Sequence, residues 1–319
     1  MIQVEGLTKY YGERAAIRDL SFTIEKGEVI GFLGLNGAGK STTLKVLGCV
    51  LLPTSGRVTI DGFDVTRDPH EIRKRIGFLP DTPPLYDEMT VGGYLEFVAE
   101  LRGVSGSAVA SRVAEVMKKT SLTDRKDELI GGLSHGFRQR VGVAQAMVHN
   151  PKLLILDEPT GGLDPVQIVE MRELIRQLKG EHTVLVSSHI LGEISQICDR
   201  YLVIQQGEII ARGTETDLSG MLGNASAVEL QVEGDAAKKA IDVLKAVAGV
   251  TDVTLTDATL RVVGSGELRP ALVKALVAAD IGVLKSDKAA ARLENIFLKL
   301  TENEKTDQQR AAGATEAKS

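Results

Sequence analysis

The sequence predicts an α/β fold in the first two thirds of the chain, and three short apolar runs are the first observation behind that prediction. The runs VIGFLG, LLILDEP and TVLVSSH are bounded by turn-forming or acidic residues, as the buried strands of a parallel sheet are. Segments with apolar residues at helical spacing lie around these runs, at residues 41–50, 109–120, 137–149, 165–179 and 191–199. Strands that alternate with helices in this way are typical of an α/β domain.

A second, antiparallel sheet is expected beside the parallel one. Residues 1–30 and the run GRVTIDGFDV alternate apolar and polar positions, which is the pattern of strands with one buried face. We therefore expect an antiparallel β subdomain joined to a parallel-sheet core.

The character of the sequence changes beyond about residue 220, where alanine and valine dominate. The segments AVELQVEG, AAKKAIDVLKAVA, TDVTLTD, TLRVVGS, ELRPALVKALVAAD and IGVLKSD follow the order βαββαβ, which predicts a ferredoxin-like α+β domain. A further helix, ARLENIFLKLT, comes next, and the polar end ENEKTDQQRAAGATEAKS predicts a disordered tail. The expected domains therefore cover residues 1–220, 221–302 and 303–319.

The composition limits the class of protein. A chain of 319 residues with 43% hydrophobic and 25% charged residues is typical of a two-domain globular protein. The net charge of −5 argues against nucleic acid as a partner bound by bulk electrostatics. Cys49 and Cys198 have no metal-like spacing, so we expect two buried thiols in a reducing cytoplasm. We find no signal peptide and no run of about 18 apolar residues, so any work at a membrane is expected to need a partner.

The stretch GLNGAGKST fits the phosphate-loop pattern of a glycine, four residues, a glycine, a lysine and a serine. It follows the strand VIGFL and opens the helix STTLKVLG, a context that a simple glycine-rich turn does not require. Its glycines let backbone amides face a phosphate, while Lys40 is expected to reach the β- and γ-phosphates and Ser41 to bind Mg²⁺. The candidate nucleotide-binding residues of the loop are Gly34, Asn36, Gly37, Ala38, Gly39, Lys40, Ser41 and Thr42.

Two acids end the buried strand LLILDEP. Asp157 is expected to bind in the Mg²⁺ shell, and Glu158 to polarise the attacking water. The alternative is a pair of surface acids at a strand end, which the four preceding apolar residues disfavour. About twenty residues earlier, GGLSHGFRQR predicts a second anion-binding helix start, because Ser134 and Gly136 offer a hydroxyl and a bare backbone amide there.

In their order along residues 1–220, these motifs resemble those of the ATP-binding cassette family, the nucleotide-binding subunits of ABC transporters. LSHGFRQR stands where the family signature stands, and GGLDP resembles the loop that crosses between subunits, with Asp164 as its key acid. Tyr11, in KYYG, matches the aromatic residue that stacks on adenine, and His189, in VSSHI, matches the switch histidine. Taken alone, Tyr11 suits a core or surface tyrosine and His189 a satisfied strand-end histidine; the resemblance reverses both interpretations.

The resemblance implies a P-loop NTPase fold of the cassette type, with an antiparallel β subdomain, a parallel-sheet core and a helical subdomain, and ATP and Mg²⁺ as cofactors. Two cassettes pair head to tail in this family. Ser134 and the Gly136 amide are therefore expected to contact the γ-phosphate held by the partner, and Glu158 and His189 to be catalytic. A homodimer then has two competent sites.

The sequence departs from the family pattern in three places. In LSHGF, His135 replaces the first of two glycines and Phe137 replaces a glutamine. His135 either adds a pH-dependent positive charge near the phosphate or is an exposed side chain at a helix start. Asp81, in IGFLPDTPPLY, stands where a glutamine normally contacts Mg²⁺ and the membrane partner, and aspartate can approach Mg²⁺ directly or through water. Leu35 stands where a proline is common, which we expect to be tolerated.

The pattern of three segments looks most like that of cassettes that serve ABC-2-type exporters, in the gliding-motility and multidrug or sodium-extrusion subgroups. The segments are FLPD, LSHGFRQRVGVAQAM and LENIFLKLT. This implies an ATPase at the cytoplasmic face of the inner membrane, attached through a separate permease. We expect the permease to contact residues 80–100 through exposed aromatic residues, Tyr86 and Tyr94 among them, and the C-terminal domain to stabilise the dimer. One alternative is a soluble cassette protein acting on ribosomes or DNA, which the lack of a heptad run and of a basic tract disfavours; another is a P-loop kinase, which Glu158 disfavours.

Overall fold

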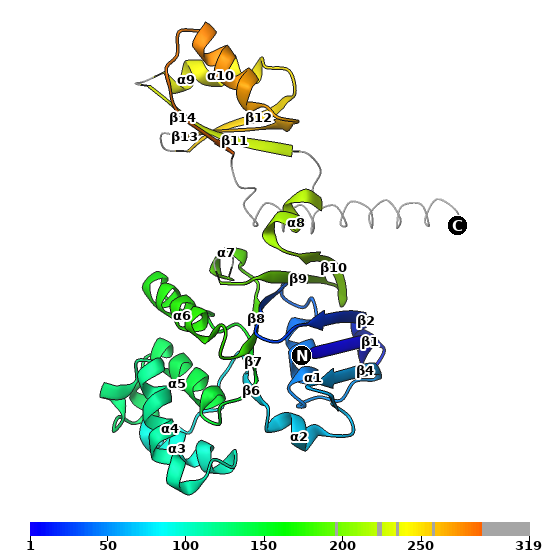
Figure 1. Cartoon of the computed structure of the whole chain (residues 1–319), viewed down its shortest axis with the longest axis vertical. Helices are drawn as coiled ribbons and strands as arrows, with labels where there is room; N and C mark the ends of the chain where they lie inside the picture. Colours follow the sequence, from blue (N-terminus) through cyan, green and yellow to red (C-terminus); the bar gives the residue numbers. More distant parts are fainter. Residues whose placement is uncertain (195–196, 222–224, 234–235, 257–258, 289–319) are drawn as a thin grey trace. The chain divides into compact units, whose positions relative to one another are not determined.

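The computed structural model describes residues 1–194, 197–221, 225–233, 236–256 and 259–288, and it divides into two units, Met1–Glu215 and Thr216–Ser319 (Figure 1). The helix expected at ARLENIFLKLT and the expected tail lie outside the described residues. Within the described ranges, no helix combines the length and the apolar character that a membrane crossing requires.

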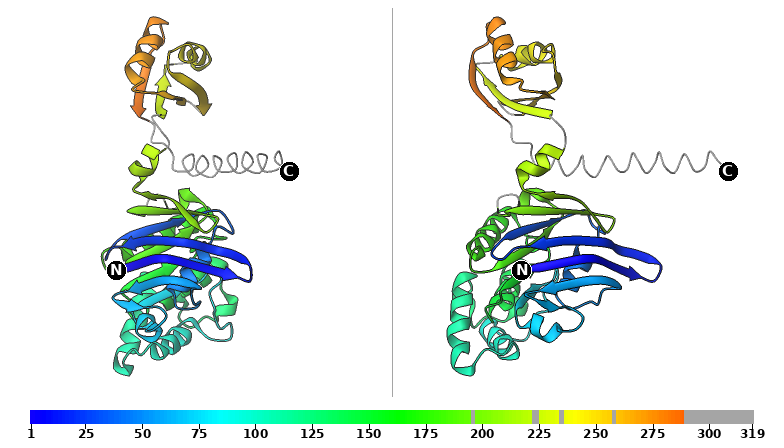
Figure 2. Two further views of the ribbon diagram at one scale, coloured as in Figure 1. Left: turned by 90° about the vertical axis from the view of Figure 1, so that its right-hand side faces the viewer. Right: turned by 45° about the vertical axis from the view of Figure 1, so that its right-hand side comes forward.

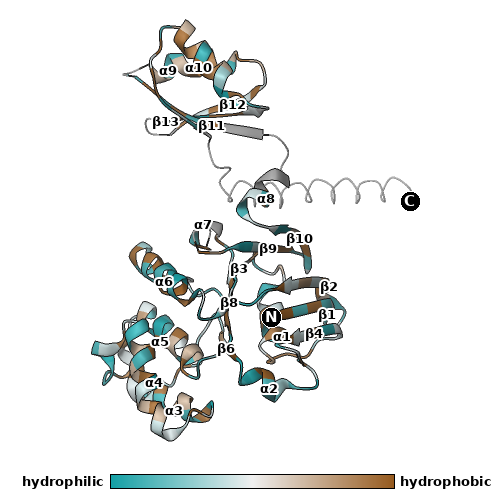
Figure 3. Ribbon diagram, viewed as in Figure 1, coloured by the Kyte–Doolittle hydropathy of each residue, from teal (hydrophilic) through white to brown (hydrophobic). Residues whose placement is uncertain are grey.

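The first unit begins with the expected antiparallel sheet, in the order β2–β1–β4–β5. Ile2 faces Ile24 on one side and Ile60 on the other, and all three are fully buried. Two long strands, β1 and β2, lie side by side in this sheet (Figure 2), and hydrophobic and hydrophilic residues alternate along them (Figure 3). Their buried positions alternate with exposed ones, so one face of the sheet is buried. The strands are β1 (Ile2–Tyr11), β2 (Arg14–Ile24), β4 (Ser55–Ile60) and β5 (Phe63–Asp64).

The second sheet has the order β10–β9–β3–β8–β7–β6, and all its neighbours are parallel except β9 and β10. The three predicted apolar runs are β3, β7 and β8, and every residue of these strands is buried. Sequence reasoning did not name the other three strands, which have the sequences IGFL, RYLVIQ and EIIARG. The strands are β3 (Val29–Leu33), β6 (Ile76–Leu79), β7 (Leu153–Leu156), β8 (Thr183–Ser188), β9 (Arg200–Gln205) and β10 (Glu208–Gly213).

Four of the predicted helices are present, with ends that differ from the prediction by at most three residues; these are α1 (Lys40–Leu47), α4 (Gly106–Lys119), α5 (His135–Met147) and α6 (Pro165–Leu178). Of the helix expected over residues 191–199, the structure describes α7 (Leu191–Ile194), and Cys198 and Asp199 are not helical. Helices α3, α4 and α5 pack on one another as a helical subdomain (Figure 1). The remaining elements of this part are α2 (Pro69–Arg73), α3 (Val91–Leu101), η1 (Thr123–Arg125), η2 (Ile130–Gly132) and α8 (Glu215–Met221).

The second unit contains the expected βαββαβ order, in a four-stranded antiparallel sheet arranged β12–β13–β11–β14. Apolar residues of the strands and of both helices form its own core, with Leu230, Leu244, Leu260 and Leu272 fully buried. The elements are β11 (Ala225–Val232), α9 (Ala237–Lys245), β12 (Val250–Thr256), β13 (Thr259–Ser265), α10 (Arg269–Ala278) and β14 (Val283–Lys288).

Candidate nucleotide site

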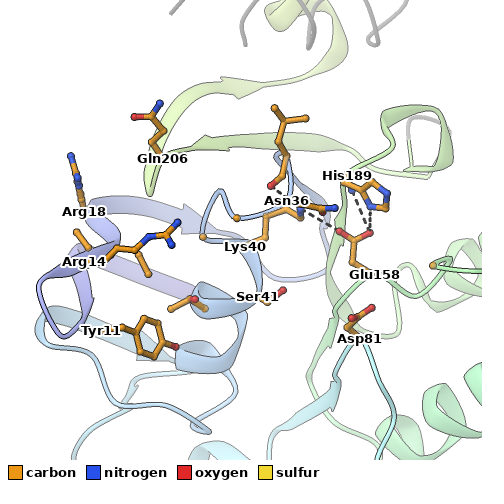
Figure 4. Close-up of a pocket in the computed structure, with 17 residues that line it drawn as sticks. Tyr11, Arg14, Arg18, Asn36, Lys40, Ser41, Asp81, Glu158, His189 and Gln206 are labelled. Atoms are coloured by element: carbon orange, nitrogen blue, oxygen red, sulfur yellow. Dashed lines mark hydrogen bonds and ion pairs between the residues drawn. The ribbon is translucent and has the colours of Figure 1, made fainter. Parts of the chain in front are cut away.

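A cavity with a volume of about 730 Å³ lies at the carboxyl edge of the parallel sheet in the first unit. Parallel strands that end at one edge bring the residues following them together there, which is where α/β folds bind ligands. The antiparallel sheet and the β3–α1 loop form one side of the cavity, and the ends of β6, β7 and β8 form the other (Figure 4). Of the residues predicted from sequence, the cavity is lined by Tyr11, Asn36, Gly37, Gly39, Lys40, Ser41, Thr42, Asp81, Glu158 and His189.

The loop between β3 and α1 has a shape that only glycine permits at two points. Gly39, just before α1, has φ of +108°, and a Cβ there would lie 2.6 Å from the Ala16 carbonyl oxygen. A Cβ at Gly34 would lie 2.5 Å from the Ile204 carbonyl oxygen. Neither position accepts a side chain, so the loop backbone packs directly against these two carbonyl groups. In this position the loop exposes its backbone amides to the cavity.

Lys40 is a buried cation at the centre of this arrangement. Its side chain is only 5% exposed, and Nζ donates a hydrogen bond of 2.7 Å to the Gly34 carbonyl oxygen. The same nitrogen lies 3.3 Å from Glu158 Oε1 (Figure 4). A buried charge needs a partner of opposite sign, and Glu158 provides it here.

The backbone conformation of Glu158 is unusual for a residue other than glycine, and its surroundings hold it in that conformation. Its φ is +50°, a left-handed conformation that costs a non-glycine residue about 1 kcal/mol or more. Its backbone amide donates to Ser187 Oγ at 2.9 Å, and its Oε2 lies 2.8 Å from His189 Nδ1. The carboxylate is thereby aimed into the cavity between a lysine and a histidine.

Asp157 lies behind Glu158 and is 1% exposed. Burial raises the pKa of its carboxyl; hydrogen bonds from Ser187 and Ser41 oppose this, while the charges of Glu158 and Asp81 add to it. Ser187 Oγ donates to Asp157 Oδ1 at 2.7 Å. A buried carboxylate beside a serine hydroxyl and a second aspartate is an oxygen donor set that suits Mg²⁺, so these residues fit the ion. Among the described residues, no group of three or more His, Cys, Asp or Glu side chains could hold a metal ion.

Sequence reasoning missed five residues that line the cavity, of which Arg14, Arg18 and Gln206 have polar side chains and the other two are Ala15 and Ala16. Arg14 pairs with Tyr11 across the β1–β2 turn, and Tyr11 is 52% exposed, so its ring is available for stacking. Among the described residues, neither arginine takes part in an ion pair. The available signal in the sequence was two arginines, three and seven positions after Tyr11.

The groups predicted for the second helix start lie elsewhere. Ser134, Gly136 and Asp164 do not line the cavity that contains Lys40. Ser134 is the N-cap residue of α5, but its side chain accepts no hydrogen bond from that helix. Asp164 caps α6 by accepting a hydrogen bond of 2.9 Å from the Gln167 amide.

The departures from the family pattern also have defined surroundings. His135 is exposed, as one interpretation expected, but its Nε2 lies 2.9 Å from the Gly161 carbonyl oxygen. The guanidinium of Arg125 lies 4.4 Å from the centre of the Phe137 ring. Leu35 is 42% exposed and is accommodated at the loop surface.

The prediction that Tyr94 is exposed was wrong. This tyrosine was expected to be exposed with Tyr86, but only Tyr86 is, at 51%, whereas Tyr94 is 3% exposed. The Tyr94 hydroxyl lies 3.1 Å from the Pro84 carbonyl oxygen and 3.2 Å from Gln145 Oε1, and burial raises its pKa to about 12. The helical phase of α3 turns Tyr94 inward, so Phe97, at 41% exposure, accompanies Tyr86 on the surface.

Comparison with known proteins agrees with this geometry. The sequence model of the ABC transporter family matches residues 17–161. The chain is 34% identical to the linearmycin resistance ATP-binding protein LnrL of Bacillus subtilis, over 94% of this chain and 98% of that protein. It is 35% identical to the bacitracin transport ATP-binding protein BcrA of Bacillus licheniformis, over 94% and 97% of the two chains.

Solved structures give the same result for the first unit. The chain resembles the ATP-binding subunit of an ABC transporter with a TM-score of 0.64 and 31% identity, over 70% of this chain and 93% of that one. It also resembles the dimeric bacterial ABC transporter cassette MJ0796, with a TM-score of 0.62 and 29% identity, over 67% and 98% of the two chains.

Proposed function

The chain belongs to the family of ABC transporter ATP-binding proteins and is an ATPase, and from this premise we propose that two copies of it close around ATP to drive a separate ABC-2-type export permease. One observation carries the proposal. The phosphate loop, Lys40 and Glu158 share one cavity, while Ser134, Gly136 and Asp164 lie outside it. Each chain thus has two half-sites that do not meet within it, and a second cassette brings them together.

Each residue of the cavity has a proposed task. The triphosphate binds the amides of residues 34–42 and Lys40, which exchanges its contact with Glu158 for one with phosphate. Glu158 accepts a proton from the attacking water, and His189 holds that carboxylate in place. Ser41, Asp157 and Asp81 hold Mg²⁺, which neutralises phosphate charge when it is bound.

The outer side of the cavity suits the rest of the nucleotide. Tyr11 stacks on the adenine, because its exposed aromatic ring lies beside the phosphate loop in the same cavity. Arg14 and Arg18 lie on the same side (Figure 4) and offer positive charge between the base and the phosphates. The trans half, with Ser134 and the Gly136 amide, binds the γ-phosphate from across the interface.

The surface for the permease is proposed at residues 80–100. Tyr86, Phe97 and Leu101 are 51%, 41% and 71% exposed, and the rings of Tyr86 and Phe97 are 5.9 Å apart. This apolar surface adjoins the Asp81 loop, so movement at the nucleotide can reach it. Through the permease the protein is held at the cytoplasmic face of the inner membrane, without nucleic acid as a partner. The names of its relatives, which concern linearmycin resistance and bacitracin transport, favour export.

We assign residues 1–220 to the cassette, 221–302 to a ferredoxin-like accessory domain and 303–319 to a tail. The antiparallel β12–β13–β11–β14 sheet with two helices supports the second assignment. Stabilisation of a homodimer is its proposed role.

Trapping the closed pair tests the central proposal. Glu158→Gln keeps the size of the side chain but removes the base, so this variant should elute as a dimer with ATP and Mg²⁺ and as a monomer with ADP. Molar mass is measured by light scattering during gel filtration, and Lys40→Ala, which loses phosphate binding, serves as the control that stays monomeric. A monomeric Glu158→Gln variant at saturating ATP would contradict the proposal.

A further inference from the structure

The first turn of α5 is joined to the loop before α6, within one chain, by the residue that departs from the family signature. His135 Nε2 lies 2.9 Å from the carbonyl oxygen of Gly161, in the loop that follows β7. A carbonyl oxygen only accepts hydrogen bonds, so Nε2 carries the proton and donates it. Protonation of Nδ1 leaves this donor in place, so the contact needs no charge on the ring.

The loop is shaped to receive the imidazole. Gly162 has φ of +71°, and a Cβ at that position would lie 3.1 Å from His135 Nε2. A side chain at residue 162 would therefore be strained and would press on the ring. The missing side chain of Gly162 thus leaves the space in which His135 lies.

A second contact lies one residue further along α5. A Cβ at Gly136 would lie 2.7 Å from both Cδ and Oε1 of Gln167. Gln167 is itself held in place, because its backbone amide donates a hydrogen bond of 2.9 Å to Asp164 Oδ1 in the cap of α6. The backbone of Gly136 is thus in direct contact with the side chain that belongs to the Asp164 cap.

Gly161 also reaches the catalytic turn. Its amide donates to the Glu158 carbonyl oxygen at 3.0 Å, and the residue itself lines the nucleotide cavity. Gly161 therefore makes one hydrogen bond with His135, at the start of α5, and another with Glu158, which bears the catalytic carboxylate.

We propose that His135 is a positioning residue: through Gly161 it holds the start of α5 and the loop Gly161–Asp164 as one preformed surface for the second cassette. This inference depends on the proposed pairing of two cassettes. Ser134, Gly136 and Asp164 then approach the partner's nucleotide together, at a fixed spacing. Loss of the bond frees the two segments from each other, which costs pairing but not the binding of ATP to a lone cassette, because His135 is outside the cavity of its own chain.

The test uses the full chain with Glu158→Gln, in which dimerisation by ATP is directly measurable. His135→Gln places an amide donor at nearly the reach of Nε2, whereas His135→Asn is one bond shorter and His135→Leu has no donor. The Gln variant should dimerise at the same ATP concentration as its parent, and the Asn and Leu variants should need about fivefold more, the effect of one net hydrogen bond. Binding of a fluorescent ATP analogue below the dimerisation threshold should be unchanged in all of them, and the melting temperature of the Asn and Leu variants should fall by no more than about 4 °C, the effect of one hydrogen bond.

Two results overturn the inference in distinguishable ways. If the Glu158→Gln parent forms dimers and all three His135 variants form them at the same ATP concentration, His135 has no positioning role. If the parent itself stays monomeric, the pairing proposal fails and this inference fails with it. With Glu158 intact, a fall in kcat at unchanged KM in the Asn variant, restored by Gln, supports positioning over a purely structural role.

Discussion

Replacing Ser187 by alanine should destabilise the acidic end of β7 more than any exposed serine would. Ser187 is fully buried, and its hydroxyl makes two bonds at once: it donates to Asp157 Oδ1 at 2.7 Å and accepts from the Glu158 amide at 2.9 Å. Alanine removes one of the two serine hydroxyls that bond to the buried Asp157 carboxylate, the other being Ser41, and leaves the buried Glu158 amide without its acceptor. A bond to a charged group contributes about 2 kcal/mol and a neutral one about 1 kcal/mol, so the expected loss is about 3 kcal/mol.

The assay is urea unfolding of Ser187→Ala and of wild type, each with and without Mg²⁺ and ATP. A loss of about 3 kcal/mol lowers the melting temperature of a unit of this size by about 9 °C. Mg²⁺ with ATP should return part of the loss, because a cation at Asp157 substitutes for the missing donor. Ser111→Ala is the control, since the Ser111 hydroxyl is exposed and donates only to the Ala108 carbonyl oxygen. A loss below about 0.5 kcal/mol would refute the assigned role of this hydroxyl.

Three further predictions concern other parts of the molecule. Arg14→Ala and Arg18→Ala should each weaken ATP binding about fivefold, measured by titration calorimetry, while Arg212→Ala, outside the cavity, should not; equal affinities would remove both arginines from the site. Tyr86→Ala should uncouple transport from ATP hydrolysis in vesicles that contain the permease, whereas Tyr94→Phe should lower stability and spare coupling; the reverse result would contradict the proposed surface. Burial lowers the pKa of His149 from 6.5 to about 4, so the unfolded chain takes up its proton first and stability falls as pH drops from 6.5 to 4; His149→Gln should flatten that slope in pH-dependent melts.

The local parts of the fold were predictable because their causes are local. The runs that became β3, β7 and β8 are apolar throughout since both faces of these strands are covered, and the phosphate loop is fixed by the spacing of its own glycines. β6 and β9 were missed although IGFL and YLVI are apolar runs about as long as the LLIL of β7, so an apolar run of this length did not by itself identify every buried strand. The exposure of Tyr94 was wrong because the helical phase of α3 depends on what it packs against, a tertiary fact.

The contacts that shape the site were beyond the sequence for a different reason. Ser187 is 30 residues from Asp157, and His135 is 26 residues from Gly161. Neither pair follows from a local pattern, since the sheet order and the packing of α5 on the loop after β7 decide which side chains meet. Sequence reasoning could name the residues that act on ATP, but not the hydrogen bonds that orient them.

Two departures from the family pattern meet at one glycine, which makes a last prediction possible. His135 bonds to the Gly161 carbonyl oxygen, and a Cβ at Gly161 would lie 3.9 Å from Asp81 Oδ1. Residues 81 and 135, far apart in the sequence, therefore both lie beside the loop that follows Glu158, His135 through a hydrogen bond and Asp81 as a close neighbour. Restoring the family residues singly, as Asp81→Gln or His135→Gly, should alter kcat, and the double variant should differ from the sum of the two effects by more than about 0.5 kcal/mol.

Coupling of that size is what a shared neighbour produces, because the position of Gly161 in one variant changes what the second substitution removes. Independent sites add within about 0.3–0.5 kcal/mol, so the cycle separates the two cases when kcat is measured at saturating ATP and Mg²⁺. A matched cycle of Asp81→Gln with Arg212→Ala, on the far strand β10, supplies the additive reference. If the Asp81 and His135 effects add as these do, each departure acts on its own, and Gly161 does not join them.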